Sequence, residues 1–452
     1  MSAPLVLRHP PGYEPERRYV YDVVLREFLG LELALVQEDR PDVEITAAGD
    51  ASGARVVLAD VLFRTPADAW LTAASLPPEP LARLATDAAT DPLPVLYGTP
   101  TLDGIDIFGA VFFMLTRYEE PVSEVRDAHE RFPATASLAH REDFLDRPLV
   151  NEYVDLLWAL LRRAWPRLER PKRRFALRLS HDVDFPLYRA PFHEARAVAR
   201  RDLRREHAPL VAMRRLANAL APDLVPKRLD LCNTFDFVMS ASERLGLQSA
   251  FYFIAGNSAG AIDGSYTLDD PWIRRLLATI HRRGHEIGYH ASYNTFRDAE
   301  RTHAEAQTLF EACAAAGVEQ PAWGGRQHYL RWENPVTWQN WEDAGLAYDS
   351  TLAFADHVGF RSGTCYEHPV FNLRTRTALR LRERPLVVME ASLLEYQKVG
   401  LDAIPAEISR LGERVRPFEG ELTLLWHNDR LLSRRARRSY LLTIGRGSGD
   451  RR

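Results

Sequence analysis

Two aspartates separated by one residue, Asp182 and Asp184, follow an apolar-alternating run at 174–179 and a segment rich in proline and arginine at 169–173. Carboxylates this close repel, so each raises the proton affinity of the other unless a cation lies between them or one serves as a proton acceptor. A turn that caps the next segment is the simpler explanation, because aspartate commonly follows a strand. The alternative is a metal or acid–base site, which needs partners elsewhere in the chain.

Such partners follow further predicted strands. They are His290 in Gly-His-Glu-Ile-Gly-Tyr-His, Arg326 and His328 in Gly-Arg-Gln-His, Glu390, and His427 after Leu-Leu-Trp. In a parallel sheet all these side chains converge beyond the carboxyl ends of the strands. One aspartate with one or two neutral imidazoles suits Zn²⁺ or a similar divalent metal. A second carboxylate can take a proton from water and a separate histidine can protonate a leaving group, so the residues predict metal-assisted hydrolysis.

The elements that must position these residues begin at residue 174, where short β-rich runs alternate with helical stretches. Predicted strands are 175–179, 249–254, 286–290, 322–325, 346–349, 386–390 and 422–426, with helices over gaps such as 271–283 and 297–316. Strands that alternate with helices pair in parallel. The pattern predicts an α/β fold in which residues 174–445 form a distorted or incomplete (β/α)7-type barrel.

Residues 1–165 are predicted to form a smaller α/β accessory domain. An amphipathic helix over 17–31, a strand within 54–62, an apolar core segment over 103–118 and a helix over 151–165 account for most of it. No repeated pattern of histidine, aspartate or glutamate marks the region as catalytic, so its role is not predicted. Residues 166–173 form the linker.

Composition narrows the classes of function. A chain of 452 residues favours two or three domains, and a net charge of −4 with a pI near 6.4 gives no general attraction to nucleic acid. Three widely spaced cysteines, Cys232, Cys313 and Cys365, argue against a disulfide framework and against a thiolate zinc site. Without a signal-peptide pattern or an apolar run of membrane-spanning length, a cytoplasmic location is expected.

A basic segment between residues 188 and 228 interrupts the barrel pattern. It contains Arg200, Arg201, Arg204, Arg205, Arg214 and Arg215. A solvated helix face is the simpler explanation. The alternative is a patch for an anionic lipid or a polyanionic substrate, which would give peripheral membrane contact through residues 196–215.

The order strand-Asp-x-Asp, Gly-His-Glu-Ile-Gly-x-His, Gly-x-Arg and apolar-apolar-x-His resembles the polysaccharide deacetylase superfamily of carbohydrate esterases over residues 174–432. Further stretches resemble a bacterial subgroup with an uncharacterised N-terminal domain. The resemblance implies that Asp182 is a general base held ionised by Arg326, that His427 is a general acid, and that Asp184 and His290 bind metal. The implied reaction releases acetate from an N-acetylated sugar, and a cytoplasmic member would act on lipid-linked or nucleotide-linked precursors.

One position departs from that family. Its motif has a second histidine four residues after the first, where this chain has Asn294. An amide oxygen is a weak zinc ligand, so His328 is the expected substitute, with a hydrogen-bonding role outside the metal as its alternative. The departure also keeps two other functions open: an amidase of a non-sugar C–N amide, and an inactive member that binds glycan or assembles a synthesis complex.

Overall fold

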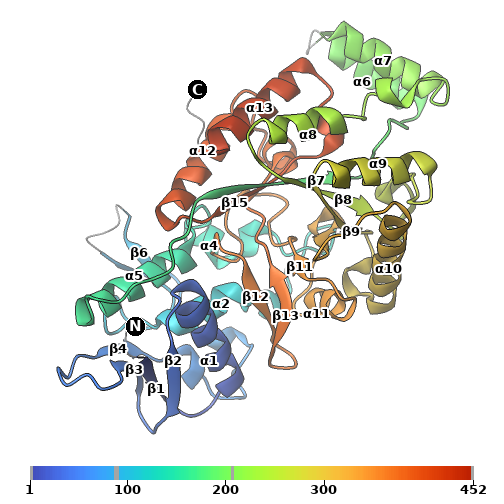
Figure 1. Ribbon diagram of the computed structural model, residues 1–452. Helices are drawn as coiled ribbons and strands as arrows, with labels where there is room; N and C mark the ends of the chain where they lie inside the picture. Colours follow the sequence, from blue (N-terminus) through green and yellow to red (C-terminus); the bar gives the residue numbers. More distant parts are fainter. Residues whose placement is uncertain (1–3, 86–90, 205–207, 449–452) are drawn as a thin grey trace.

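The computed structural model describes residues 4–85, 91–204 and 208–448; Arg205 of the basic segment lies outside them. Its main element is a curled nine-stranded sheet with strand order β12-β13-β11-β10-β9-β8-β7-β15-β14 (Figure 1). The strands are β7 (Ala176–Val183), β8 (Ser249–Ile254), β9 (Glu286–Ala291), β10 (Gly324–Gln327), β11 (Tyr348–Asp349), β12 (His368–Asn372), β13 (Thr377–Glu383), β14 (Val388–Met389) and β15 (Glu421–Leu425). The predicted fold class, a mixed α/β chain with a barrel-like sheet, is confirmed.

Every neighbouring pair in this sheet is parallel except β12 and β13, which form an antiparallel hairpin. This hairpin was not predicted, and β10 begins two residues later than predicted. Helices cover the sheet: α8 (Phe235–Glu243), α9 (Pro271–Arg282), α10 (Ala299–Ala315), α11 (Val336–Asp343), α12 (Ile404–Val415) and α13 (Arg434–Ser448). Two of them begin at aspartate caps, Asp270 before α9 and Asp298 before α10, each of which accepts a backbone N–H of the first turn.

The N-terminal region has its own four-stranded sheet, ordered β2-β1-β3-β4. Its elements are β1 (Leu5–His9), α1 (Glu14–Tyr21) continued by a π-helical segment Asp22–Phe28, β2 (Leu33–Gln37), β3 (Asp42–Ala47), β4 (Val56–Ala59), β5 (Ala82–Leu84), β6 (Leu93–Val95), α2 (Ile107–Leu115), α3 (Glu119–Val122), α4 (Leu138–Arg141) and α5 (Leu149–Ala164). The inserted basic segment forms a helical hairpin of α6 (Phe192–Arg204) and α7 (Pro209–Leu220). No helix in the described part of the chain combines the length and the apolar character that crossing a bilayer requires.

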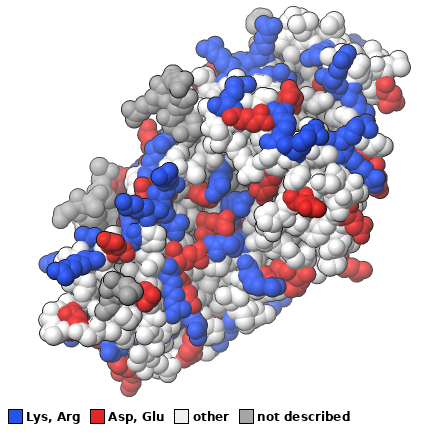
Figure 2. Space-filling view, viewed as in Figure 1, with Lys and Arg blue, Asp and Glu red and all other residues white. Residues whose placement is uncertain are grey.

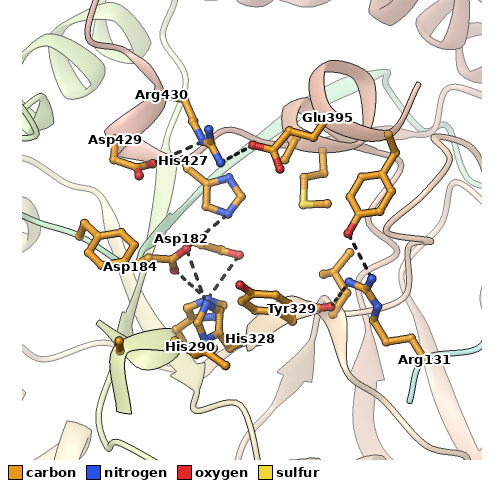
Figure 3. Close-up of a pocket in the computed structure, with 17 residues that line it drawn as sticks. Arg131, Asp182, Asp184, His290, His328, Tyr329, Glu395, His427, Asp429 and Arg430 are labelled. Carbon is orange, nitrogen blue, oxygen red and sulfur yellow. Dashed lines mark hydrogen bonds and ion pairs between the residues drawn. The ribbon is translucent and has the colours of Figure 1, made fainter. Parts of the chain in front are cut away.

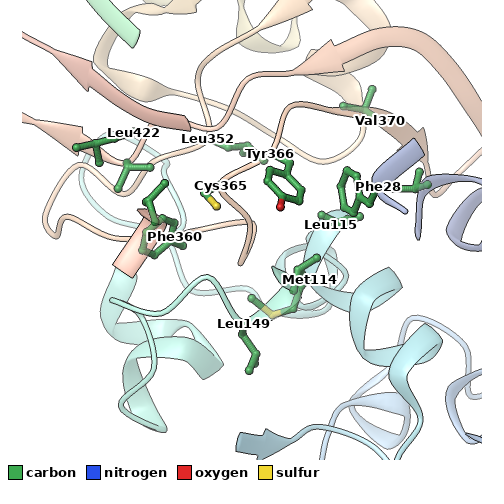
Figure 4. Packing of buried hydrophobic residues seen from close by; sticks show 14 of the residues in the cluster. Phe28, Met114, Leu115, Leu149, Leu352, Phe360, Cys365, Tyr366, Val370 and Leu422 are labelled. Carbon is green, nitrogen blue, oxygen red and sulfur yellow. The ribbon is translucent and has the colours of Figure 1, made fainter. Parts of the chain in front are cut away.

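The N-terminal region and the barrel share one hydrophobic core. Figure 4 shows Phe28, Met114 and Leu149 packed among side chains of the barrel segment such as Phe360 and Val370. The buried side chains are thus continuous across residues 166–173. The division into two domains at this linker stays a prediction.

A buried ion network also crosses this junction. Glu120 accepts from Arg361 at 2.6 and 2.9 Å and from Arg117 at 2.8 Å, and Arg117 also donates to Glu119 at 2.8 Å. All four side chains are buried. The carboxylates lie among two guanidinium groups that have no access to water, so the network depends on each member being present.

A second buried acidic pair, Asp349 and Glu383, lies on the neighbouring strands β11 and β13. Burial raises the pKa of Asp349 to about 7, and burial together with Asp349 raises the pKa of Glu383 well above its usual range. One oxygen of Asp349 accepts from Thr351, while the other has no hydrogen-bond partner. The folded protein therefore holds a proton here that the unfolded chain releases.

We expect Asp349→Asn to stabilise the protein at neutral pH. The native state binds more protons at Asp349 than the unfolded state between about pH 4 and pH 7, so native stability falls as pH rises through that window. Asparagine keeps the accepting oxygen and carries no charge. Thermal unfolding should show an advantage for Asp349→Asn that grows from pH 4 to pH 7 and is then constant. The exposed Asp103→Asn serves as control; an equal change in both variants would contradict the prediction.

Candidate active site

A pocket of 370 Å³ lies beyond the carboxyl ends of β7, β9, β10 and β15 (Figure 3). The structure brings six of the seven sequence-predicted residues to it: Asp182, Asp184, His290, His328 and His427 line the pocket, and Arg326 lies directly beneath. The seventh, Glu390, contacts His427, with its Oε1 2.7 Å from the His427 Nδ1. The convergence follows from parallel pairing, since β15, β7, β8, β9 and β10 are consecutive neighbours in the sheet.

Asp184, His290 and His328 could hold a metal ion, because one ligand atom of each lies within 4.8 Å of the others. His290 Nε2 lies 3.2 Å from Asp184 Oδ1, and His328 Nε2 lies 3.7 Å from Asp184 Oδ2. Asp184 Oδ1 and His290 Nε2 are buried without a hydrogen-bond partner. Two buried polar atoms that face each other unsatisfied are costly unless an ion or a proton lies between them.

The opposite ring nitrogen of each histidine explains this orientation. Nδ1 of His290 faces the Arg326 carbonyl oxygen at 2.9 Å, and Nδ1 of His328 faces Asp263 at 2.9 Å. Each Nδ1 must therefore carry the hydrogen, which leaves the Nε2 lone pair directed at Asp184. Two imidazoles and a carboxylate, fixed in this way, fit a divalent metal such as Zn²⁺.

Asn294 lies outside this cluster. Its side-chain nitrogen donates to the Ser258 carbonyl at 2.9 Å, and its side-chain oxygen accepts from Arg331 at 3.0 Å. Both ends of the amide are engaged in holding the loop after β9, and the residue is exposed. Of the two alternatives for the third ligand, His328 lies beside Asp184 and His290, and Asn294 does not.

Charge also favours a cation at Asp184. Burial alone raises the pKa of the Asp184 carboxyl, but the facing imidazoles of His328 and His290 outweigh burial and hold that pKa well below its usual range. In the same way burial lowers the pKa of His328, while Asp184 and Asp263 together raise it to about 9. Positive charge is therefore favoured beside the Asp184 carboxylate, either on a protonated imidazole or on a metal cation.

Asp182 lies beside this cluster but is held by a different partner. Arg326, fully buried, donates to Asp182 Oδ1 at 2.7 Å and uses its other nitrogens on the Ser350 carbonyl and hydroxyl. The remaining oxygen of Asp182 lies 3.8 Å from His290 Nε2. One oxygen is therefore fixed by a charged hydrogen bond and the other faces the cluster, where it can accept a proton.

His427 approaches from the other side of the pocket. Its Nδ1 lies 2.7 Å from Glu390 Oε1 and its Nε2 lies 3.8 Å from Asp184 Oδ2. Burial lowers the pKa of His427, but Glu390, Asp184 and Asp182 raise it to about 10. An imidazolium oriented by a buried glutamate can give a proton to a group bound in the pocket. By contrast, His181 turns away from the pocket to the Trp426 carbonyl, as alternation along a strand predicts.

Several pocket residues were not predicted. Asp263, in the short turn Gly260–Asp263 after β8, fixes His328, and Asp429, Arg430, Glu395 and Tyr396 form the rim. Arg131 comes from the N-terminal region and donates to the Tyr329 carbonyl at 2.9 Å and the Tyr396 hydroxyl at 3.2 Å. The N-terminal region, whose role was not predicted, therefore contributes a side chain to the wall of the pocket. These residues lie in loops without a recurring spacing, so no signal in the sequence marked them.

Asp263 offers a test of the histidine orientation. We expect Asp263→Asn to weaken metal binding by roughly 10–100-fold, as is typical when the partner of a ligating histidine loses its charge. Asn294→Ala, in a neighbouring loop, should leave metal affinity unchanged. Titration of each purified protein with Zn²⁺ measures both. Weaker binding in Asn294→Ala, with Asp263→Asn unaffected, would reverse the assignment.

Three comparisons with known proteins place the chain. Residues 6–166 match a family described as a "Family of unknown function (DUF7033)". None of the curated proteins compared with the chain matches it. Among solved structures, a protein assigned as a polysaccharide deacetylase from Mycobacterium smegmatis is 17% identical, with 64% of this chain and 87% of that chain covered and a TM-score of 0.39. Puue allantoinase is 11% identical, with 62% and 86% covered and a TM-score of 0.36.

Proposed function

We propose that this protein is a metal-dependent hydrolase of a C–N amide, and specifically that it removes the acetyl group from an N-acetylated sugar. The observation that carries the proposal is the arrangement around Asp184. Imidazoles from β9, from the turn after β10 and from the end of β15 direct Nε2 at one carboxylate, while a second carboxylate lies alongside in a charged hydrogen bond.

Asp184, His290 and His328 would hold the metal, which fits Zn²⁺ by ligand type. A divalent cation bound by these residues would polarise the substrate carbonyl and make water more acidic. The remaining residues then have separate tasks, because hydrolysis of an amide needs one proton removed from water and one delivered to the leaving nitrogen.

Asp182 is suited to remove the proton. Its free oxygen faces the cluster, and the bond from Arg326 fixes the carboxylate so that it cannot rotate away. His427 is suited to deliver the proton, because Glu390 fixes its ring and favours its charged form. Water supplies the hydroxyl that joins the acyl carbon, and the C–N bond breaks to give acetate and a free amine.

The walls of the pocket favour a sugar among possible amides. Tyr329, Tyr396 and Phe185 line it together with charged groups such as Arg430 and Glu395. Aromatic side chains offer flat apolar faces against which the C–H face of a sugar ring packs, and the charged groups can bond its hydroxyls.

Metal analysis of the purified protein, followed by measurement of acetate release from N-acetylated sugars, tests the proposal. We expect about one Zn²⁺ per chain and acetate release that a chelator abolishes and added Zn²⁺ restores. Stoichiometric metal without acetate from any N-acetylated sugar would reject the sugar and leave a hydrolase of another C–N amide. Absence of bound metal with no hydrolysis would reject the enzyme and favour a binding role.

A further inference from the structure

A second cavity, of 890 Å³, adjoins the proposed catalytic pocket. Phe185, Ala261, Asp429 and Arg430 line both spaces. Apolar side chains such as Val198, Val211 and Leu432 line much of the second cavity. Charged side chains such as Arg189, Arg201 and Asp202 complete the lining. It is larger than the catalytic pocket and lies beside the α6–α7 hairpin. A substrate bound in the catalytic pocket could thus extend an apolar portion under the hairpin.

The inner face of the hairpin is held by contacts within the inserted segment. Arg215 of α7 donates to Asp202 of α6 at 2.8 Å, and Arg215 also donates to Tyr188 at 3.3 Å. Asp230 accepts from the backbone of Tyr188 and from Asn218. These polar contacts and the small apolar cluster around Tyr188 and Ala195 fix one side of each helix. The other side is left to solvent.

That outer side carries apolar residues at helical spacing. On α7, Leu210, Met213 and Leu220 are 62%, 61% and 66% exposed. They stand three and seven residues apart, which places them in one stripe along the helix. On α6, Phe192 and Leu203 are also exposed. An apolar stripe open to water is a sign of an interaction surface rather than of core packing.

Arginines flank this stripe. The exposed arginines of the hairpin include Arg196, Arg200, Arg204 and Arg214. In the described part of the hairpin the ion pairs are formed by other residues, such as Arg215 with Asp202. Figure 2 shows basic and uncharged side chains together at the end of the molecule where Figure 1 places α6 and α7. The chain as a whole carries a net charge of −4, so this local excess of positive charge is not a general property.

We propose that the outer face of the α6–α7 hairpin docks on an anionic lipid bilayer, and that the sugar acted on is attached to a lipid whose apolar chain enters the second cavity. An apolar stripe flanked by arginines is the pattern of a helix that lies in a membrane interface, where the stripe enters the acyl boundary and the arginines meet anionic headgroups. The second cavity lies between the inner face of that hairpin and the catalytic pocket, with which it shares part of its lining. The second part of this proposal rests on the proposed function.

Sedimentation with vesicles tests the docking. We expect the protein to bind phosphatidylcholine vesicles that contain roughly 30% phosphatidylglycerol, an anionic lipid. Binding to vesicles of pure phosphatidylcholine should be far weaker. Arg196→Gln with Arg200→Gln should weaken binding about 25-fold, which is roughly fivefold for each arginine. Leu210→Ser with Met213→Ser should weaken it roughly tenfold.

A matched control carries Arg163→Gln, Arg167→Gln and Leu102→Ser, which are exposed positions of the N-terminal region. The control should bind vesicles as the native protein does. Circular dichroism checks that each variant is folded. If the serine variant binds as tightly as the native protein, the patch attracts polyanions only and membrane docking is rejected. If the control weakens binding as much as the hairpin variants, the contact is non-specific and docking is likewise rejected.

Kinetics with two probes test the lipid chain. N-acetylglucosamine linked to a long alkyl chain, in the same vesicles, should be hydrolysed with a kcat/KM at least tenfold higher than that of its methyl glycoside. Val211→Trp, which narrows the second cavity, should remove this difference. The same variant should leave kcat/KM for the methyl glycoside unchanged. Equal efficiency for the two probes would overturn the lipid assignment while the proposed hydrolase stands. Vesicle binding without hydrolysis of either probe would reject N-acetylglucosamine as the sugar and retain the docking surface.

Discussion

Asp182→Asn should lower kcat for deacetylation by about 10²–10⁴-fold while the protein still binds metal. This range is what a positioned general base contributes. Asparagine keeps an oxygen for the bond from Arg326, so the buried guanidinium stays partnered, but an amide cannot take a proton from water. Acetate release and metal content, measured on the same preparation, separate loss of the base from loss of the metal.

Asp184→Asn is the informative comparison for Asp182→Asn. It removes a charged member of the proposed metal cluster, so both metal content and activity should fall. The two aspartates have the same side chain and lie two residues apart, yet they should fail in different ways. If Asp182→Asn loses its metal and Asp184→Asn retains it, the assignment of base and ligand is reversed.

Glu120→Ala should destabilise the protein by about 3–5 kcal/mol, because removal of one partner from a buried ion network leaves charge without compensation. Glu120 accepts from both Arg117 and Arg361, and neither guanidinium can reach water after the change. Chemical denaturation measures the free energy of unfolding directly. The loss should appear in the common unfolding transition, since the network joins the N-terminal region to the barrel.

The exposed pair Glu79 and Arg141 provides the control. Their atoms approach to 2.5 Å, but both side chains are more than a third exposed. Surface ion pairs contribute about 0–1 kcal/mol, so Glu79→Ala should have little effect. A loss of several kcal/mol in Glu79→Ala, or none in Glu120→Ala, would show that burial does not decide the strength of these contacts.

Much of the site could be predicted because strand direction orders it. Asp182, His290 and Arg326 each follow a short apolar run, and parallel pairing places such residues beyond one edge of the sheet whatever the loop lengths. For the third metal ligand the sequence left two alternatives, His328 and Asn294. Composition and spacing could not show that Asn294 engages both ends of its amide in its own loop, because that depends on where Ser258 and Arg331 lie.

The features missed are those that spacing does not encode. The β12–β13 hairpin joins two neighbouring strands without a helix between them. Its antiparallel pairing therefore breaks the alternation of strands with helices from which the barrel was predicted. Asp263 occupies a turn between β8 and α9, and Arg131 lies in a loop of another region. Contacts between loops that are distant in sequence are fixed by the assembled core, so they become visible only when the fold is known.

The position of Arg131 has a consequence for how this protein can change over evolutionary time. The residues proposed to move protons all belong to the barrel segment, whereas part of the pocket wall is supplied by the N-terminal region through Arg131 and its bonds to Tyr329 and Tyr396. Under the proposed function, substitutions near residue 131 would alter which substrate is admitted without altering the proton-transfer groups. Selectivity and reactivity would then be encoded in separate stretches of one gene, while the continuous core requires the two stretches to be inherited together.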